Sequence, residues 1–313
     1  VLIDRRLSQE SDDISLNTLG LYGLTVLIWG SSWLAIHFQI GVVAPEVSIV
    51  YRFVLASVVL VGWCAIRGIS LRIDIRHHLY LAMMGFCLFC LNYILFYHAA
   101  FHLATGLLAV IFSMITVMNI FNGVFFLNRS IHPRTLVGVT FGLGGMGLVF
   151  WPEISRSGHE ALVAIGLSVL ATYSASLGNI ISARNQLHGI AVAPANAIGM
   201  AYGALFLLAY SLWADSPFEI DLSASYVGSL VFLSLFASAI AFGTYLTLVG
   251  RIGPENAAYA TVLFPIVALA LSTWVEGYQW QMRALVGVVL ILIGNVVVLS
   301  KRGFVTQWIR RAG

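Results

Sequence analysis

Charge is scarce in this chain. Only 9% of its 313 residues are Asp, Glu, Lys or Arg, and 60% are hydrophobic. In a typical soluble domain about a quarter of the residues carry charge. A composition this poor in charge excludes a soluble globular protein and indicates a chain that is embedded in a membrane.

The short motifs of nucleotide-driven and metal-dependent chemistry are also missing. The sequence has no Walker loop, no dinucleotide-binding fingerprint and no zinc-protease helix motif. Among its three cysteines, Cys87 and Cys90 form a lone pair without the second pair that a zinc site would need. We therefore expect no cofactor and no metal site. The net charge of +3 comes from loops and predicts no nucleic-acid partner.

What the chain has instead is a series of long apolar runs with short polar breaks between them. A helix needs about 20 apolar residues to cross a bilayer, whereas the strands of a membrane barrel would alternate over about ten residues. The sequence predicts an all-α integral membrane protein with ten transmembrane helices, at residues 21–38, 47–66, 79–97, 105–127, 135–151, 161–183, 195–213, 226–249, 257–275 and 284–299.

The chain also repeats itself. A shift of 149 places moves Ala44-Pro45 onto Ala193-Pro194 and the sequence LVGV at 136–139 onto LVGV at 285–288. One offset that fits anchors near both ends of each half is typical of an internal duplication. We predict a tail at 1–18, a first five-helix repeat at 19–152, a second at 161–300 and a tail at 301–313.

The basic residues predict the orientation. With the N-terminus inside, most Arg and Lys residues fall in cytoplasmic loops, and only Arg156 and Arg283 fall outside. Both termini are then cytoplasmic in a multi-pass protein of the inner (plasma) membrane. Because each repeat has an odd number of helices, the second must be inverted relative to the first, which is typical of alternating-access transporters.

Several of these residues carry a family resemblance. The sequence WGSSW at 29–33, Pro45 followed by Arg52 and Ala56, and Phe264-Pro265 with Glu276 and Gly287 resemble the EamA branch of the drug/metabolite transporter superfamily. The first repeat departs from the pattern, with Thr116 and Leu127 at the positions that correspond to Pro265 and Glu276. The resemblance implies export or exchange of a small metabolite, with amino acids and related compounds a frequent class.

Arg52 is the one basic residue inside a predicted span. An isolated central Arg costs about 2.5–3.5 kcal/mol on insertion scales. It would therefore either anchor a substrate carboxylate or reach the outer surface and cap carbonyls there.

Polar side chains in the spans supply the other candidates for substrate binding. Helix four carries Ser113, Thr116, Asn119 and Asn122 at every third place, either as a cavity wall or as hydrogen bonds between helices. The full set that we predict to bind substrate is Trp33, Arg52, Asn92, Tyr93, Ser113, Thr116, Asn119, Tyr173, Asn179, Tyr202, Thr244, Tyr245 and Tyr259.

Two further features concern packing and movement. Gly138, Gly142 and Gly145 form a small face that predicts close packing of helix five on helix ten or on a second subunit, as in a homodimer through these faces. Pro265 would either act as a hinge or fix a static kink in helix nine.

The function that these features favour is a secondary transporter with a small-molecule substrate and the lipid bilayer as partners. No span contains an Asp or Glu away from its ends, which removes a carboxylate proton relay, so facilitated transport or exchange is the simplest mechanism. The alternatives are an intramembrane enzyme, for which no midspan acid or base would activate Ser113 or Ser238, and a sensor or scaffold without flux.

Overall fold

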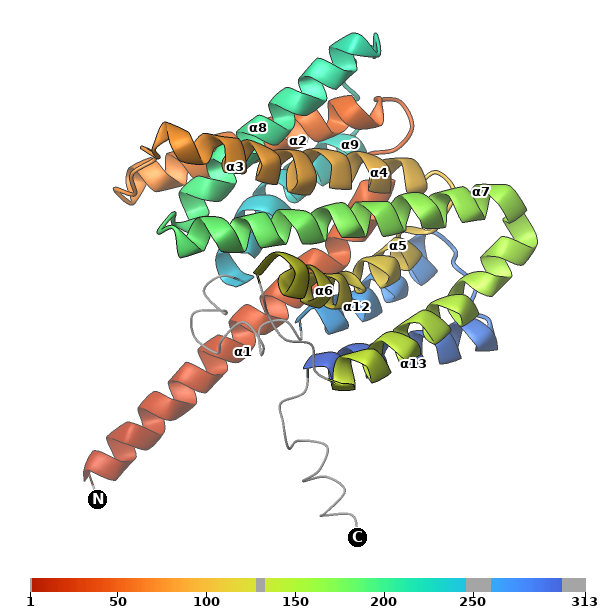
Figure 1. Cartoon of the computed structure of the whole chain (residues 1–313), viewed down its shortest axis with the longest axis horizontal. Coiled ribbons are helices and arrows are strands. Elements are labelled where there is room, and N and C mark those ends of the chain that lie inside the picture. Colours follow the sequence, from red (N-terminus) through yellow and green to blue (C-terminus); the bar gives the residue numbers. More distant parts are fainter. Residues whose placement is uncertain (1, 128–132, 246–259, 300–313) are drawn as a thin grey trace.

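The computed structural model describes residues 2–127, 133–245 and 260–299 (Figure 1). Most of the described residues are in helices, and none of them is in a strand. The elements are α1 (Leu2–His37), α2 (Pro45–Ile66), α3 (Ile75–Met84), η1 (Gly85–Leu91), α4 (Asn92–Ala99), α5 (Thr105–Phe112), α6 (Ile115–Leu127), α7 (Pro133–Leu187), α8 (Val192–Trp213), α9 (Ala224–Val231), η2 (Phe232–Ile240), α12 (Ala260–Val275) and α13 (Met282–Leu299).

The apolar runs are helical wherever the structure describes them. Six helical stretches are long and apolar enough to cross a membrane by length and composition, and two shorter apolar helices lie at 260–275 and 282–297. Two of the predicted spans lie within the single element α7, where Gly158 interrupts the helical backbone with a φ of 50°. The fold is therefore that of an all-α membrane protein.

Local irregularities divide several of the predicted spans. The third and eighth spans each contain a π-helical segment, η1 and η2, and the fourth is interrupted at Ser113 and Met114 between α5 and α6. The first helix is longer than expected, because α1 begins at Leu2 and runs through most of the predicted N-terminal tail. A π-helical segment is a local change from i→i+4 to i→i+5 hydrogen bonding, which a continuous apolar run does not reveal, so η1 and η2 were not predicted.

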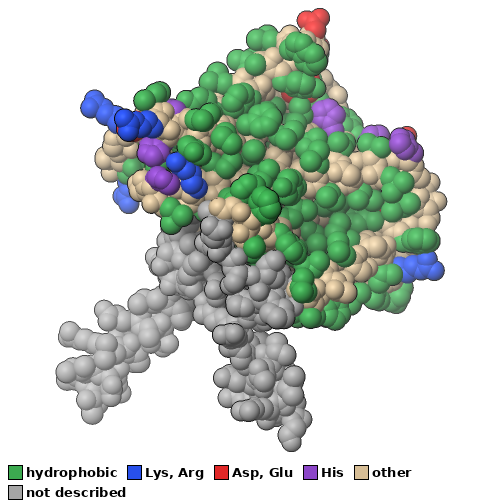
Figure 2. Space-filling view, in the orientation of Figure 1, with side chains coloured by type: hydrophobic (Ala, Val, Ile, Leu, Met, Phe, Trp, Pro, Cys, Tyr) green, Lys and Arg blue, Asp and Glu red, His purple; other side chains and the backbone are tan. Residues whose placement is uncertain are grey.

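The outer surface agrees with a lipid environment. Figure 2 shows hydrophobic side chains over most of the visible face, whereas Arg and His side chains gather mainly at its opposite ends. Large apolar residues such as Phe125, Trp213 and Trp274 are more than four-fifths exposed. In water such a surface would be unfavourable, but lipid solvates it.

Glycine faces join α7 to α13. A Cβ atom added to Gly145 would lie 2.5 Å from the carbonyl oxygen of Gly287, and one added to Gly294 would lie 2.6 Å from that of Gly138. The earlier glycine of α7 thus meets the later glycine of α13, so the two helices are antiparallel. This confirms the predicted packing of helix five on helix ten within one chain, while the homodimer stays a prediction.

Close approach at these glycines should make them sensitive to a single methyl group. We expect Gly145→Ala to lower the free energy of unfolding by about 1–3 kcal/mol, because the added Cβ meets backbone atoms that cannot move aside. Denaturation in mixed detergent micelles measures this. The control is Gly144→Ala, where a Cβ would meet nothing within 4 Å, and equal effects of the two variants would show that the glycine contact is not tight.

Candidate functional site

Arg52 lies buried where α2 meets α4 and η2. Pro45 occupies the first position of α2, where its missing N–H costs no hydrogen bond, and Arg52 follows about two turns later. Its side chain is 2% exposed. The Nε atom donates to Ser238 Oγ at 3.3 Å, and a terminal nitrogen donates to the Tyr93 hydroxyl at 3.3 Å. The guanidinium carbon also lies 4.5 Å from the centre of the Tyr93 ring.

This cation has no anion beside it. In the part of the chain that the structure describes, Arg52 forms no ion pair with a carboxylate, and its second terminal nitrogen has no hydrogen-bond partner. The Tyr97 hydroxyl, on α4, is also buried without a hydrogen bond of normal length among the described residues, and the Arg52 guanidinium acts on it electrostatically. A buried charge is costly unless it is paired and hydrogen-bonded. The arrangement therefore suits a ligand that brings a negative charge and further acceptor oxygens.

The burial and the partners of Arg52 distinguish a snorkelling or capping side chain from a substrate anchor. A snorkelling side chain would expose its guanidinium, and a capping side chain would donate to backbone carbonyls. At 2% exposure Arg52 does not reach the surface. Both of its hydrogen bonds within the described residues go to side-chain hydroxyls. The geometry thus favours the carboxylate-anchor interpretation, which stays a prediction.

Aromatic rings fill the neighbouring space. Phe53 packs against the Tyr93 ring at 4.8 Å between centroids. One turn beyond Tyr93, Phe96 meets Trp33 at 5.0 Å, and Trp33 also contacts Phe112 and Phe264. Rings at these distances exclude water, and a charge interaction is stronger in such surroundings than in solvent.

The polar stripe of helix four makes hydrogen bonds between helices. Thr116 pairs with Thr261 of α12 at 3.1 Å, and Asn119 accepts from Asn179 of α7 at 3.5 Å. Asn122 donates to Ser176 of α7 at 2.8 Å, whereas Ser113 bonds a carbonyl of its own helix. Thr116 and Asn119 thus have helix partners in this conformation, and their substrate role stays a prediction.

The structure disperses the remaining predicted residues. Asn92 donates to the Ala171 carbonyl at 2.9 Å, Tyr202 bonds His78 at 2.8 Å, and Tyr173 is 41% exposed at the surface. Thr244 accepts from Thr25, and the Tyr245 ring contacts Trp29. Tyr259 lies outside the described residues. Of the predicted residues that are described, only Tyr93 is in hydrogen-bond or ring contact with Arg52.

Two π-helical segments flank this region at matching places in the chain. The 149-residue shift moves η1 onto 234–240, which lies inside η2. In η1 the Cys87 carbonyl accepts from Ser174 Oγ at 2.7 Å, and in η2 the Ala237 carbonyl accepts from Trp29 Nε1 at 3.3 Å. Each segment is thus bonded by a helix of the other half. Pi-helical turns in α-helices occur frequently at functional sites.

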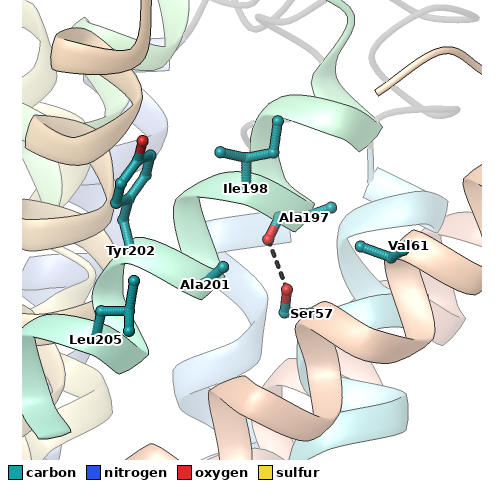
Figure 3. A pocket seen from close by; sticks show the side chains of 7 residues that line it. All are labelled: Ser57, Val61, Ala197, Ile198, Ala201, Tyr202 and Leu205. Atoms are coloured by element: carbon teal, nitrogen blue, oxygen red, sulfur yellow. Dashed lines mark hydrogen bonds between the residues drawn. The ribbon is translucent and has the colours of Figure 1, made fainter. Parts of the chain in front are cut away.

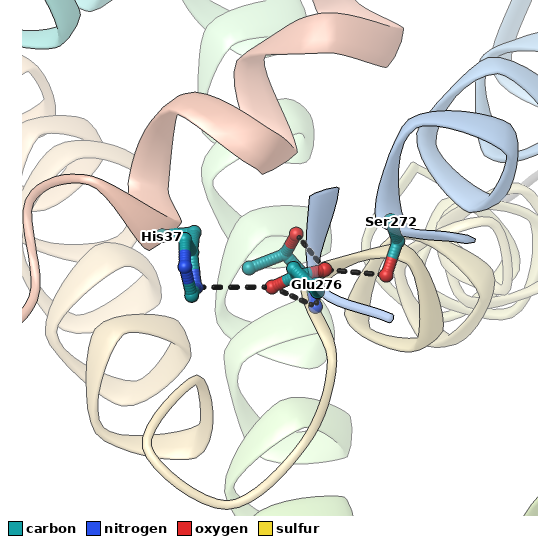
Figure 4. A network of polar contacts seen from close by, with 4 residues as sticks. His37, Ser272 and Glu276 are labelled. Carbon is teal, nitrogen blue, oxygen red and sulfur yellow. Dashed lines mark hydrogen bonds and ion pairs between the residues drawn. The ribbon is translucent and has the colours of Figure 1, made fainter. Parts of the chain in front are cut away.

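A second polar cluster lies where α1 and α12 end and α5 begins (Figure 4). Glu276 accepts from the Thr105 backbone N–H at 3.0 and 3.2 Å and from the Thr105 hydroxyl at 2.9 Å. It also accepts from Ser272 Oγ, and His37 Nδ1 lies 3.3 Å from it. Because Thr105 begins α5, the carboxylate sits at the positive end of that helix and completes its first turn.

The comparisons with known proteins agree with this architecture. The model of the EamA-like transporter family matches residues 19–151 and again 162–300. The chain belongs to the EamA-like transporter family.

Relatives of this EamA-like transporter are distant in sequence but similar in length. Protein PagO of Salmonella typhimurium is 21% identical over 90% of this chain and 92% of its own. A probable amino-acid metabolite efflux pump of Escherichia coli is 23% identical over 87% of this chain and 91% of its own. A solved crystal structure has a TM-score of 0.66 at 15% identity and covers 95% of this chain and 98% of that one, so it has the same fold.

Sequence reasoning missed two parts of the site in this EamA-like transporter. Tyr97 lies one turn after Tyr93, so the 3.6-residue period could have placed it on the same face. Ser238 was considered only as a possible enzyme nucleophile, and its bond to Arg52 was not predicted. Among the described residues, no group of three or more His, Cys, Asp or Glu side chains could hold a metal ion.

Removal of the Glu276 carboxylate should weaken the fold. We expect Glu276→Ala to lower the free energy of unfolding by about 1–2 kcal/mol, because the first turn of α5 loses its acceptor. Glu276→Gln keeps one acceptor oxygen, so its free energy of unfolding should lie between those of the wild type and of Glu276→Ala. Thermal unfolding in detergent measures the change, with Glu160→Ala, at a site whose side chain is 71% exposed, as control. An unchanged melting temperature in Glu276→Ala would contradict the capping role.

Proposed function

We propose that this protein is a secondary transporter that exports or exchanges a small carboxylate-bearing metabolite, an amino acid or a related compound, by alternating access. The observation that carries the proposal is the buried Arg52 guanidinium, which has no counter-ion among the described residues and is held between α2 and α4 of the first half and η2 of the second. A ligand carboxylate would supply the missing charge. The amino-acid metabolite efflux pump among the relatives supports this substrate class.

The proposed architecture is ten transmembrane helices in two inverted repeats. The glycine contacts support it, because the pairs Gly138–Gly294 and Gly145–Gly287 exchange with each other under the 149-residue shift. When two equivalent helices are related by a two-fold axis, each contact between them has a counterpart in which the two partners have exchanged places. The bonds to η1 and η2 have this relation at the level of helices but not residue for residue, because each joins the π-helical segment of one half to a helix of the other.

Polar contacts at one end support a conformation that is closed there. Besides the Glu276 cluster, Gln39 donates to the Tyr226 carbonyl and to Ser229 Oγ at 2.9 and 2.6 Å, and Ser48 bonds the Tyr226 hydroxyl at 2.8 Å. These contacts tie helices of the first half to helices of the second. In an alternating-access cycle they would have to break and reform, with Arg52 reached from either side in turn.

We propose the inner membrane as location, with both termini in the cytoplasm. The connection at 67–74 contains two of the arginines that orient the chain. The polar contacts of Glu276 and Gln39 then lie at the outer end of the molecule.

Cysteine labelling in whole cells tests this orientation. In a background without Cys64, Cys87 and Cys90, we expect Ser157→Cys to react with a membrane-impermeant maleimide in intact cells. Ser70→Cys should react only after the cells are permeabilised. Both serines are exposed, so reactivity depends on the side of the membrane. The opposite pattern would show that the topology is inverted.

The alternative functions lack a supporting site. An intramembrane enzyme would need an activated nucleophile, but in the described part of the chain the Ser238 hydroxyl contacts Arg52 and no His, Asp or Glu. A sensor or scaffold would bind ligand without moving it. Flux therefore separates the proposed function from both.

Reconstitution in liposomes tests the proposed function. We expect uptake and counterflow of at least one member of a labelled amino-acid panel without a pH gradient, as facilitated exchange requires. Flux that appears only with the gradient would contradict facilitated exchange and indicate proton coupling. No flux for any member would contradict the amino-acid assignment.

Arg52 should be needed for that flux. We expect Arg52→Ala to lower counterflow by more than about tenfold, because a hydrogen bond to a charged group contributes about 1.5–3 kcal/mol. Arg52→Lys keeps the charge but loses the planar guanidinium fork that binds a carboxylate through two parallel hydrogen bonds, and it should retain part of the activity. Arg156→Ala, at an exposed site, is the matched control. Full flux in a well-folded Arg52→Ala protein would show that Arg52 does not bind substrate.

A further inference from the structure

An apolar groove of about 300 Å³ lies between α2 and α8, away from the Arg52 site (Figure 3). Its walls include Val61 of α2 and Ile198 and Leu205 of α8. Val61 and Leu205 are 39% and 58% exposed, so the groove opens on the outer surface of the molecule. The Ser57 hydroxyl on its floor donates to the Ala197 carbonyl and leaves no free donor there. The groove therefore suits a hydrocarbon chain.

One end of the groove leads to a cluster of positive charge. Tyr202 lines the groove, and its hydroxyl bonds His78 Nδ1 in the first turn of α3 at 2.8 Å. Along α2, Arg67 follows Val61 by six residues, which is about 9 Å of helix. Arg76 lies two residues before His78, so Arg67 and Arg76 each follow closely along the chain on a residue that lines the groove or bonds its lining.

Arg67, Arg72 and Arg76 are three of the basic residues at this end. Within the described residues none of them forms an ion pair, and all three are exposed. The one acidic residue between positions 67 and 80 is Asp74, which caps α3 through the backbone N–H of Arg76. The charge of the three arginines is therefore available to an external anion. Figure 2 shows Arg and His side chains gathered at one end of the molecule.

An aromatic side chain marks the depth of the polar boundary. Trp63, which is half exposed, lies between Val61 and Arg67, and the Arg67 guanidinium stacks 5.1 Å from its ring centre. Tryptophan collects at the level of lipid headgroups, where one side of its ring is apolar and its N–H is wet. Apolar groove, tryptophan and arginines thus follow each other along α2 in the order of acyl chain, interface and headgroup.

We propose that this face binds one anionic phospholipid, with an acyl chain in the α2/α8 groove and its phosphate between Arg67, Arg72 and Arg76. The occupant is a lipid rather than a soluble phosphate, because the groove and the arginines are adjacent and only a lipid fills both. Arginine beside an anionic headgroup contributes about fivefold in affinity per residue. A zwitterionic lipid would fill the groove but gain little from the arginines.

Native mass spectrometry of the whole protein in neutral detergent tests this. We expect phosphatidylglycerol to be retained in preference to phosphatidylcholine with the same acyl chains. The triple variant Arg67→Gln/Arg72→Gln/Arg76→Gln should lose most of that preference, about fivefold for each arginine. Arg156→Gln, at the opposite end, should keep it. Equal retention of the two lipids, or an unchanged preference in the triple variant, would overturn the proposal.

A second variant tests the groove separately. Ala201→Leu places a larger side chain in the groove and should reduce retention of both lipids while all arginines remain. Val289→Leu, at a site 47% exposed on α13, is the control. If glycerol phosphate alone binds as tightly as phosphatidylglycerol, the groove has no part and the lipid proposal is wrong. Circular dichroism shows whether each variant is folded.

Discussion

Arg52 carries its charge in a region from which aromatic rings exclude water, and the organisation of the centre of the molecule follows from that. The guanidinium is held by hydroxyls from α4 and η2 and by the face of Tyr93. These contacts orient it without neutralising it. The insertion of a charged arginine costs a few kcal/mol, and a fold keeps such a residue only when another group compensates its charge. Among the described residues no carboxylate provides that compensation, and the carboxylate of the proposed substrate would supply it.

The two halves of the chain meet around this charge. Arg52 belongs to the first half and Ser238 to the second, so binding at the guanidinium acts on both. The π-helical segments add to this, because each has a carbonyl bonded by a helix of the other half. The end of the molecule at which α5 begins is held by Glu276 on the first turn of that helix. A change in the central contacts can therefore reach the end contacts through rigid helices that link them.

The fold could be read from the sequence to a large extent, and the site only in part. Long apolar runs fix helices in lipid because no other secondary structure satisfies the backbone, and Arg52 was found because charge in a span is rare. Tyr202 was expected in the site, yet it faces the α2/α8 groove. Hydroxyl and amide side chains are common in membrane helices and bond neighbouring helices as readily as a ligand. Composition does not tell which face of a helix turns inward.

The measurement that tests the central claim most directly is the selectivity of counterflow between an amino acid and its carboxamide. The two differ only in the charge that Arg52 would receive. We expect the wild-type protein to prefer the carboxylate and Arg52→Gln to lose that preference. A preference that is the same in Arg52→Gln as in the wild type would contradict the account.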